Sequence, residues 1–157
     1  QQTMRLYLVQ HGEAVDKTVD PERPLSEQGR EDVAAMAGRL SDAGVHVERV
    51  WHSGKLRAAE TAGLLAKAVI KGGGTEAISG ISPNDDVAAF AQDADVWGQD
   101  TLVVGHLPFM GQLVSHLVTG NAEMPLVAFR PGSVVCLERG VDGGWLLLWM
   151  LRPGLTD

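Results

Sequence analysis

The sequence has one cysteine, no long apolar run and no excess of positive charge, and each absence excludes a class of protein. A lone Cys136 excludes an internal disulfide and a thiolate metal cluster, and its apolar neighbours predict a buried small hydrophobe. No run of about 18 apolar residues is present, so no transmembrane helix is expected. The formal net charge of −7 argues against a nucleic-acid or membrane-surface binder, although an anionic substrate remains compatible with locally positive charge.

The N-terminus also lacks a basic segment followed by an apolar one, so we expect no secretory signal and a cytoplasmic protein. Gln1, Gln2 and Thr3 precede Met4 and are interpreted as a ragged start. With 157 residues, of which 45% are hydrophobic, the chain can bury a sizeable core, which predicts one domain over residues 1–157.

Apolar patterning predicts alternating strands and helices. The pattern predicts strands at 6–10, 45–51, 101–105, 134–138 and 145–151 and helices between Ser26 and Gly44, at 56–69, from Asp85-Asp86 to about Ala94, and at 108–118, with a polar loop at 14–24. Strands that alternate with helices favour a three-layer α/β sandwich with a mostly parallel central sheet and helices on both faces. The last two strands flank a glycine-rich turn and should form an antiparallel hairpin.

Histidines follow two of the predicted strands. His11-Gly12 ends the first strand, and His106 follows Gly105 at the end of the strand at 101–105. Ligands bind beyond the carboxyl ends of strands in open α/β sheets, so both imidazoles should lie at one edge. Gly12 would let the backbone turn and approach a ligand closely. Such a histidine can act as nucleophile, base or metal ligand, and the structural alternative is that it only caps a strand.

A positive group should reach the same edge from the helix at 56–69. Arg57 lies in its first turn, shortly after Ser53, and a guanidinium beside free N–H groups makes a cradle for phosphate. Two histidines with an arginine favour phosphoryl transfer through a histidine. No carboxylate cluster suits magnesium and no histidine spacing matches zinc, so we expect a mechanism without metal or cofactor.

The order and spacing of these motifs resemble the histidine phosphatase superfamily. The motifs are His11-Gly12 after a strand, Ser53-x-x-x-Arg57-Ala58-x-x-Thr61, and Gly105-His106-x-Pro108. The short chain and Arg23-Pro24-Leu25-x-x-x-Gly29 are similar to the small bacterial SixA-type phosphohistidine phosphatases. The resemblance spans about Met4 to Leu151 and implies a phosphoglycerate-mutase-like fold.

The resemblance also implies roles. His11 would attack phosphorus and carry a phosphohistidine intermediate, while His106 would bind the equatorial oxygens and Arg57 would clamp the phosphoryl group. Arg23 would add a second positive contact. The remaining predicted substrate contacts are Gln10, Gly12 and Ser53. The implied partner is a phosphohistidine-containing protein or phosphorelay domain, with phosphate or another anion in the site; the oligomeric state stays open.

One departure concerns the residue before the nucleophile, where the family has arginine and this chain has Gln10. Glutamine donates hydrogen bonds but brings no charge, and one oxyanion donor is worth roughly 3 to 4 kcal/mol. The alternative interpretation is therefore a weak or inactive member that binds a phosphorylated partner or an anion. Arg23 or Lys55 is a candidate for partial compensation.

A second departure concerns the general acid that protonates an alcohol leaving group in larger members. Glu13, Asp85 and Asp86 are the nearest candidates, and the last two are better explained as helix caps. A labile P–N bond needs less acid assistance, which favours phosphohistidine as the substrate. A small-molecule phosphomonoesterase is the further alternative.

Several conspicuous residues are given structural interpretations. His52 is expected at the rim and Trp97 in an exposed loop, whereas Glu60 either orients Arg57 or forms a surface salt bridge. The other strand tryptophans are expected in the core or at its edge, and they are Trp51, Trp145 and Trp149.

Overall fold

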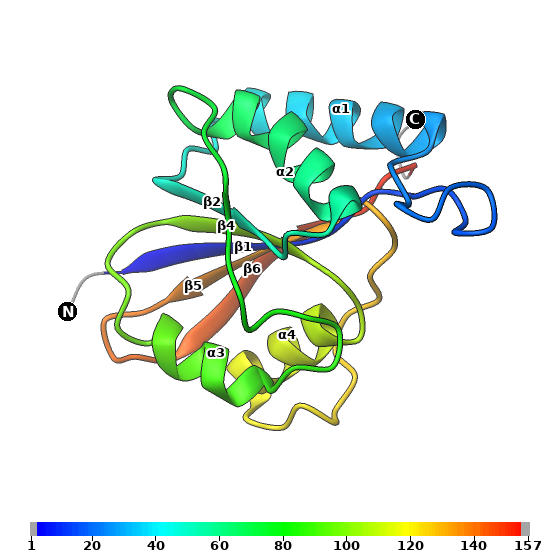
Figure 1. Cartoon of the computed structure of the whole chain (residues 1–157). Coiled ribbons are helices and arrows are strands. Elements are labelled where there is room, and N and C mark those ends of the chain that lie inside the picture. Colours follow the sequence, from blue (N-terminus) through cyan, green and yellow to red (C-terminus); the bar gives the residue numbers. More distant parts are fainter. Residues whose placement is uncertain (1–2, 155–157) are drawn as a thin grey trace.

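The structure, a computed structural model, describes residues 3–154. Within that range a six-stranded sheet lies between two helical layers (Figure 1). In chain order the elements are β1 (Met4–Gln10), α1 (Glu27–Asp42), β2 (Arg49–His52), α2 (Leu56–Val69), β3 (Glu76–Ala77), α3 (Val87–Ala94), β4 (Thr101–Gly105), α4 (Phe109–Thr119), β5 (Val134–Arg139) and β6 (Trp145–Leu151). The predicted three-layer α/β fold is confirmed.

The sheet has the order β3-β2-β4-β1-β5-β6. The first four strands in that order are parallel, whereas β5 and β6 form an antiparallel hairpin that pairs with β1, as predicted. In the pairing of β1 with β4, Gln10 is opposite Gly105. The next residues, His11 and His106, therefore leave the sheet side by side.

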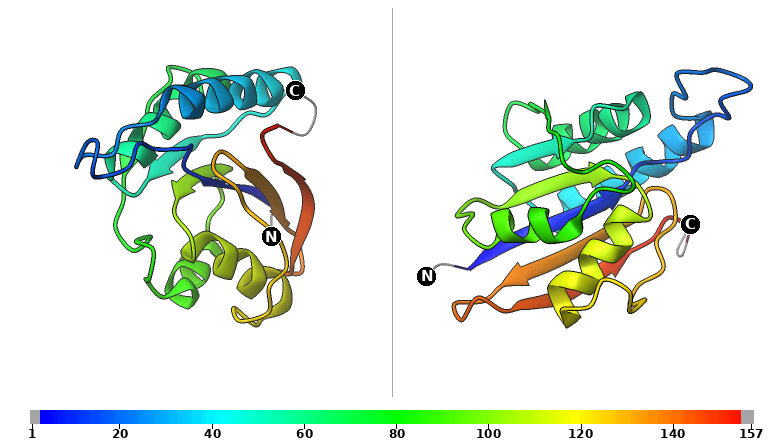
Figure 2. Two further views of the ribbon diagram at one scale, coloured as in Figure 1. Left: turned by 90° about the vertical axis from the view of Figure 1, so that its right-hand side faces the viewer. Right: turned by 60° about the horizontal axis from the view of Figure 1, so that its bottom comes forward.

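Figure 2 shows helices on both faces of the sheet. A hydrophobic core lies between the sheet and the helices on each face. Residues of β1 alternate between the two cores, because successive side chains on a strand point to opposite faces. Tyr7 and Val9 contribute to the core under α1 and α2, and Leu6 and Leu8 to the core under α3 and α4. Cys136 is buried in the first core, as predicted.

The helix boundaries follow capping signals. The Ser26 side chain accepts the N–H of Gly29 at the start of α1, and the Asp86 side chain accepts that of Ala88 at the start of α3. The helix expected from Pro108 begins one residue later, with Pro108 as its N-cap.

Two strand predictions need correction. The strand expected at 45–51 begins only at Arg49, because Val45 and Val47 reach the core from irregular backbone. The N–H of Val47 donates to the carbonyl of Val69 at 2.9 Å instead of pairing in the sheet. Strand β3 was not predicted, since two exposed residues carry no periodic pattern.

The tryptophans also differ in part from expectation. Trp145 is buried and Trp149 packs against the first core, as predicted. Trp97 is half-buried instead of exposed, because it meets Trp51 and Phe90 edge-on at ring-centroid distances of 5.2 and 5.3 Å. Among residues 3–154 no helix has the length and apolar character needed to cross a membrane.

Candidate active site

The two histidines predicted at one sheet edge lie together, with ring centroids 5.0 Å apart. The backbone N–H of His11 donates to the carbonyl of Gly105 at 3.0 Å, which ties the end of β1 to the end of β4. On the other side, the N–H of Gly132 lies 3.0 and 3.2 Å from the carbonyl oxygens of Gln10 and His11. The turn at Gly132 has a φ of 88°, which favours glycine, and it was not predicted to support the site.

The tautomer of His11 follows from its nearest contact. Its Nδ1 lies 2.7 Å from the carbonyl oxygen of Gly12, and a carbonyl only accepts, so Nδ1 carries the proton. In the neutral ring the lone pair is then on Nε2. Burial lowers the pKa of His11; the Gly12 contact opposes this, and the charges of Arg57 and Arg23 lower the pKa further. His11 is therefore a neutral imidazole at pH 7 with an unprotonated Nε2.

His106 is more deeply buried. Burial, followed by the interaction with the neighbouring His11 and the charge of Arg57, lowers the pKa of His106 to about 3, so this ring is also neutral at pH 7. Its Nε2 lies 2.6 Å from the Ser53 hydroxyl, which joins the end of β4 to the turn after β2. Its Nδ1 is buried and has no hydrogen-bond partner in the described part of the chain.

Arg57 is the second residue of α2, so it lies at the positive end of that helix, as predicted. Burial, with the nearby charge of Arg23, lowers the pKa of Arg57, although a guanidinium stays charged at neutral pH. Within residues 3–154, its buried Nε lacks a hydrogen-bond partner. An unpaired buried polar atom costs about 1 to 3 kcal/mol, so Arg57 Nε and His106 Nδ1 suit a ligand that pairs with them.

The loop between β1 and α1 supplies a second arginine. Arg23 has a left-handed φ of 51°, which costs a non-glycine residue roughly 1 kcal/mol or more. Its Nε donates to the Val15 carbonyl at 3.1 Å, and an isolated bridge between Ala14 and Leu25 closes the loop. The charge of Arg23 lowers the pKa of both His11 and His106, so the loop adds to the positive field at the pair.

Hydrogen bonds from α2 hold these segments together. The N–H of Gly12 donates to Thr61 Oγ1 at 2.9 Å, and the Thr61 hydroxyl donates to the Arg57 carbonyl at 2.8 Å. Thr61 thus joins the nucleophile turn to the helix that carries Arg57. Sequence reasoning included Thr61 in a motif but assigned it no role.

Glu60 connects the arginine loop to the same helix. Its carboxylate accepts the N–H of Leu25 at 2.8 Å and pairs with Arg30 at 2.6 Å. The alternative in which Glu60 orients Arg57 is wrong, because the carboxylate faces the loop and α1 instead. Glu60 fixes Leu25, two residues after Arg23.

The glycine at position 12 is required by packing. A Cβ added there would lie 2.7 Å from Val33 Cγ2 and 3.2 Å from Leu25 Cδ2, so α1 leaves no room for a side chain. Its N–H is already bonded to Thr61. Gly12 therefore serves the close approach of α1 to the nucleophile turn.

The remaining polar candidates bond locally. Glu13 accepts the Ser26 hydroxyl at 2.7 Å, Asp85 accepts the N–H of Ser82 at 2.8 Å, and Asp86 caps α3. His52, expected at the rim, is buried, and its Nδ1 accepts the N–H of Gly54 in the turn before α2. No three His, Cys, Asp or Glu side chains of residues 3–154 converge on a metal-sized site.

A profile of the histidine phosphatase superfamily (branch 1) matches residues 6–71. An uncharacterized protein of Picosynechococcus sp. is 32% identical over 138 residues, which cover 83% of each chain. The chain belongs to the histidine phosphatase superfamily. Among members of this superfamily, the Escherichia coli phosphohistidine phosphatase SixA is 29% identical over 155 residues, covering 96% of this chain and 94% of SixA.

A solved structure supports the same assignment. The protein histidine phosphatase SixA complexed with tungstate superposes with a TM-score of 0.86 at 27% identity, covering 98% of this chain and all of that one. The chain is thus a SixA-like histidine phosphatase with the phosphoglycerate-mutase-like fold predicted from sequence.

Gln10 is the residue at which this histidine phosphatase departs from the motif. Its side chain is buried at the end of β1, and no described group pairs with Oε1. A carboxamide carries no charge, so the positive field that lowers the pKa of His11 comes from Arg57 and Arg23. The site keeps a cationic environment without an arginine at position 10.

Proposed function

We propose that this chain hydrolyses phosphohistidine on a protein through a covalent phosphoryl intermediate on His11. The observation that carries the proposal is the hydrogen bond from His11 Nδ1 to the Gly12 carbonyl, which leaves Nε2 unprotonated. The His11 ring lies beside a second neutral imidazole, and the charges of Arg57 and Arg23 act on it. Such a group needs no base to become a nucleophile.

The reaction takes two displacements. In the first, His11 Nε2 forms a bond to phosphorus while the P–N bond of the substrate breaks, and the departing imidazole takes a proton from water. In the second, water attacks phosphorus on His11, the bond to Nε2 breaks, and inorganic phosphate leaves; the proton that the attacking water gives up neutralises the hydroxide left by the first displacement. His11 returns to its neutral state, ready for another cycle.

The neighbouring groups stabilise the charge that develops on the phosphoryl oxygens. Arg57 offers its buried unpaired Nε–H, and Arg23 adds positive charge from its loop. His106 is held by Ser53 and offers its ring to the equatorial oxygens. Gln10 contributes the N–H donors of its amide but no charge. Positioning and electrostatics are what phosphoryl transfer chiefly requires.

Two further observations favour phosphohistidine over an alcohol ester. Glu13, Asp85 and Asp86 are engaged in local hydrogen bonds, so none is free to serve as an acid for a poor leaving group. The relatives add support, since the E. coli protein is a phosphohistidine phosphatase and the solved SixA holds tungstate, a tetrahedral oxyanion like phosphate.

The test is release of phosphate from a histidine-phosphorylated protein by the native chain, His11→Ala and Gln10→Arg. We expect release by the native chain, loss in His11→Ala, and faster release in Gln10→Arg, because a guanidinium restores a charged donor. Hydrolysis of an aryl phosphate at a higher kcat/KM than the phosphoprotein would indicate a small-molecule phosphomonoesterase instead.

The uncharged Gln10 favours one second candidate, a member that binds a phosphorylated partner without turnover. In that case the native chain would bind the phosphoprotein but release no phosphate, and Gln10→Arg would recover release. The arginine-to-glutamine difference would then be the switch between binding and catalysis.

A further inference from the structure

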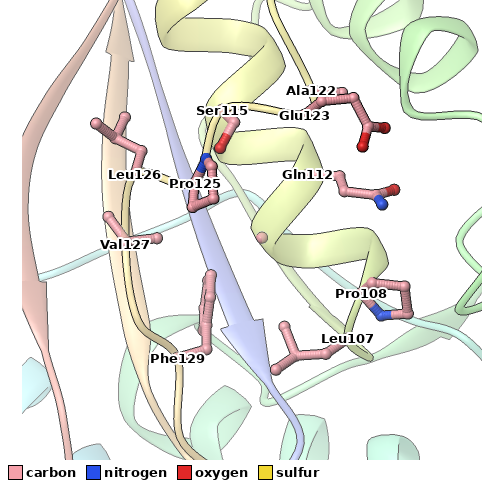
Figure 3. Close-up of a pocket in the computed structure, with 11 residues that line it drawn as sticks. Leu107, Pro108, Gln112, Ser115, Ala122, Glu123, Pro125, Leu126, Val127 and Phe129 are labelled. Carbon is pink, nitrogen blue, oxygen red and sulfur yellow. The ribbon is translucent and has the colours of Figure 1, made fainter.

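A groove of about 330 Å³ runs along α4 beside the site (Figure 3). One wall is the start of α4 with Leu107 and Pro108, and the other is the segment from Ala122 to Phe129. Gly111 also lines the groove, and Figure 3 shows the labelled side chains that line it. Leu107 and Leu126 are 40% and 44% exposed, so the groove presents uncovered apolar surface.

Both walls contain residues that are close in the chain to residues of the candidate active site. Leu107 follows His106, and consecutive Cα atoms are only about 3.8 Å apart. Phe129 lies three residues before Gly132, whose N–H bonds to the carbonyls of Gln10 and His11. Figure 3 shows Leu107 and Phe129 at the same end of the groove. The end of the groove formed by Leu107 and Phe129 therefore lies next to the candidate active site.

Local packing does not require a glycine at position 111, which lines the groove. A Cβ added at Gly111 would meet only Leu107 Cδ2, at an ordinary contact distance of 3.9 Å, and the residue lies inside a helix with ordinary φ. Glycine in a helix interior costs about 1 kcal/mol relative to alanine. The missing side chain keeps the groove open.

The chemistry of the lining excludes the phosphoryl group as its occupant. The lining is mostly apolar, and its only charged side chain is Glu123. An anion would be repelled there, whereas an apolar side chain with a cation nearby would be accepted. The cations that suit the phosphoryl group, Arg57 and Arg23, lie at the histidines instead.

We infer that this groove docks the phosphohistidine-bearing protein by receiving an apolar side chain one helical turn from the phosphohistidine. The inference rests on the proposed function. Side chains four residues apart lie on one helix face and about 6 Å apart along its axis, so one helix can present phosphohistidine to His11 and an apolar side chain to the groove. A lysine or arginine on the same face would meet Glu123.

The probe is an alanine-rich helical peptide with one histidine, phosphorylated chemically with phosphoramidate. One version carries leucine four residues before and after the phosphohistidine, the other carries serine at both places, and both carry the same lysines. Binding is measured on His11→Ala, which cannot accept the phosphoryl group. We expect the leucine peptide to bind about tenfold more tightly, since one apolar side chain in a pocket is worth roughly 10- to 200-fold.

Groove filling provides the decisive comparison. Adding Gly111→Leu to the His11→Ala variant should abolish the preference for the leucine peptide. Adding Gly38→Leu, the same change at an open position of α1, should leave it intact. Equal binding of both peptides by the His11→Ala parent, or a preference that survives Gly111→Leu, overturns the inference.

Two other outcomes are distinguishable. A leucine preference without phosphate release by the native chain would overturn the proposed function and leave the docking groove standing. If sedimentation shows a dimer that Gly111→Leu dissociates, the groove is covered by a second copy and the docking inference fails.

Discussion

The two sides of the site are built differently. On the side of α1 and α2, hydrogen bonds tie every segment to its neighbour: Thr61 holds the turn after β1, and Glu60 holds the loop that carries Arg23. On the side of α4, an open groove lined by apolar side chains such as Leu107 and Leu126 lies next to the site.

The difference separates two tasks. Phosphoryl transfer needs charges fixed to within a fraction of an ångström, which a hydrogen-bonded frame provides. Recognition of a larger substrate needs exposed apolar surface that becomes buried on binding. We interpret the first side as holding the reacting groups and the second as selecting the molecule that carries the phosphoryl group.

The largest effect is expected when the nucleophile, His11, is removed. His11→Ala should lower the rate of phosphate release at least about 10³-fold, because the neighbouring His106 has its Nε2 bonded to Ser53 and its Nδ1 buried. Phosphate release from a phosphohistidine protein is the measurement. His46→Ala, at an exposed position after Val45, is the matched control and should keep the native rate.

The second largest effect is expected when the guanidinium of Arg57 is replaced. Arg57→Lys keeps the positive charge but loses the planar fork and the buried Nε–H, so kcat should fall about 10²-fold. Arg5→Lys makes the same change at an exposed position on β1, where Arg5 pairs with Glu138. An equal loss in both variants would mean that Arg57 has no special role.

The hydrogen-bonded frame should show a smaller effect. Thr61→Val removes the acceptor of the Gly12 N–H and the donor to the Arg57 carbonyl, so we expect kcat to fall about tenfold and unfolding free energy to drop about 1 to 3 kcal/mol. Thr61→Ser keeps the hydroxyl and should restore most of the rate. If serine and valine act alike, the methyl group and not the hydroxyl matters.

The smallest effect is in the pH dependence. The pKa of His11 is lowered below about 6.5, the ordinary value for histidine, so more than half of the nucleophile is unprotonated at that pH. Plots of log kcat/KM should be nearly level from pH 8 to 6.5 and decline only at lower pH. A kcat/KM that has already fallen to half its plateau value at pH 6.5 or above would contradict the lowered pKa.

The lowered pKa of His106 should also make the free energy of unfolding decrease as the pH falls. The pKa of His106 is about 3 in the folded chain and ordinary when unfolded, so the unfolded state binds more protons between these values. The contribution of neutral His106 is thus present above pH 6.5 and is lost as the pH falls toward 3. Urea unfolding of the native chain and His106→Gln should show a smaller pH dependence in the variant.

The sequence predicted the positions of the reacting groups because strand ends and helix starts are local features. His11, His106 and Arg57 each follow or begin an element whose pattern is visible in the chain. Pairing of Gln10 with Gly105 then places the histidines together. These predictions depend only on which ends of the strands meet.

Contacts between distant segments were not predictable. The bond from Gly132 to His11, the contact of Glu60 with Leu25 and the burial of Trp97 each depend on how loops pack. Likewise, Val45 and Val47 alternate as strand residues would, but the alternation reflects burial without sheet pairing. A one-dimensional pattern records burial and does not identify the partner.

The central claim is that His11 Nε2 accepts the phosphoryl group. The direct measurement is ³¹P NMR of the chain, labelled with ¹⁵N-histidine and mixed with phosphoramidate under alkaline conditions that preserve phosphohistidine. The account predicts a phosphoryl signal coupled to Nε2 of His11 that is absent in His11→Ala. A phosphoryl group on Nδ1, on another residue, or unchanged in His11→Ala would contradict it.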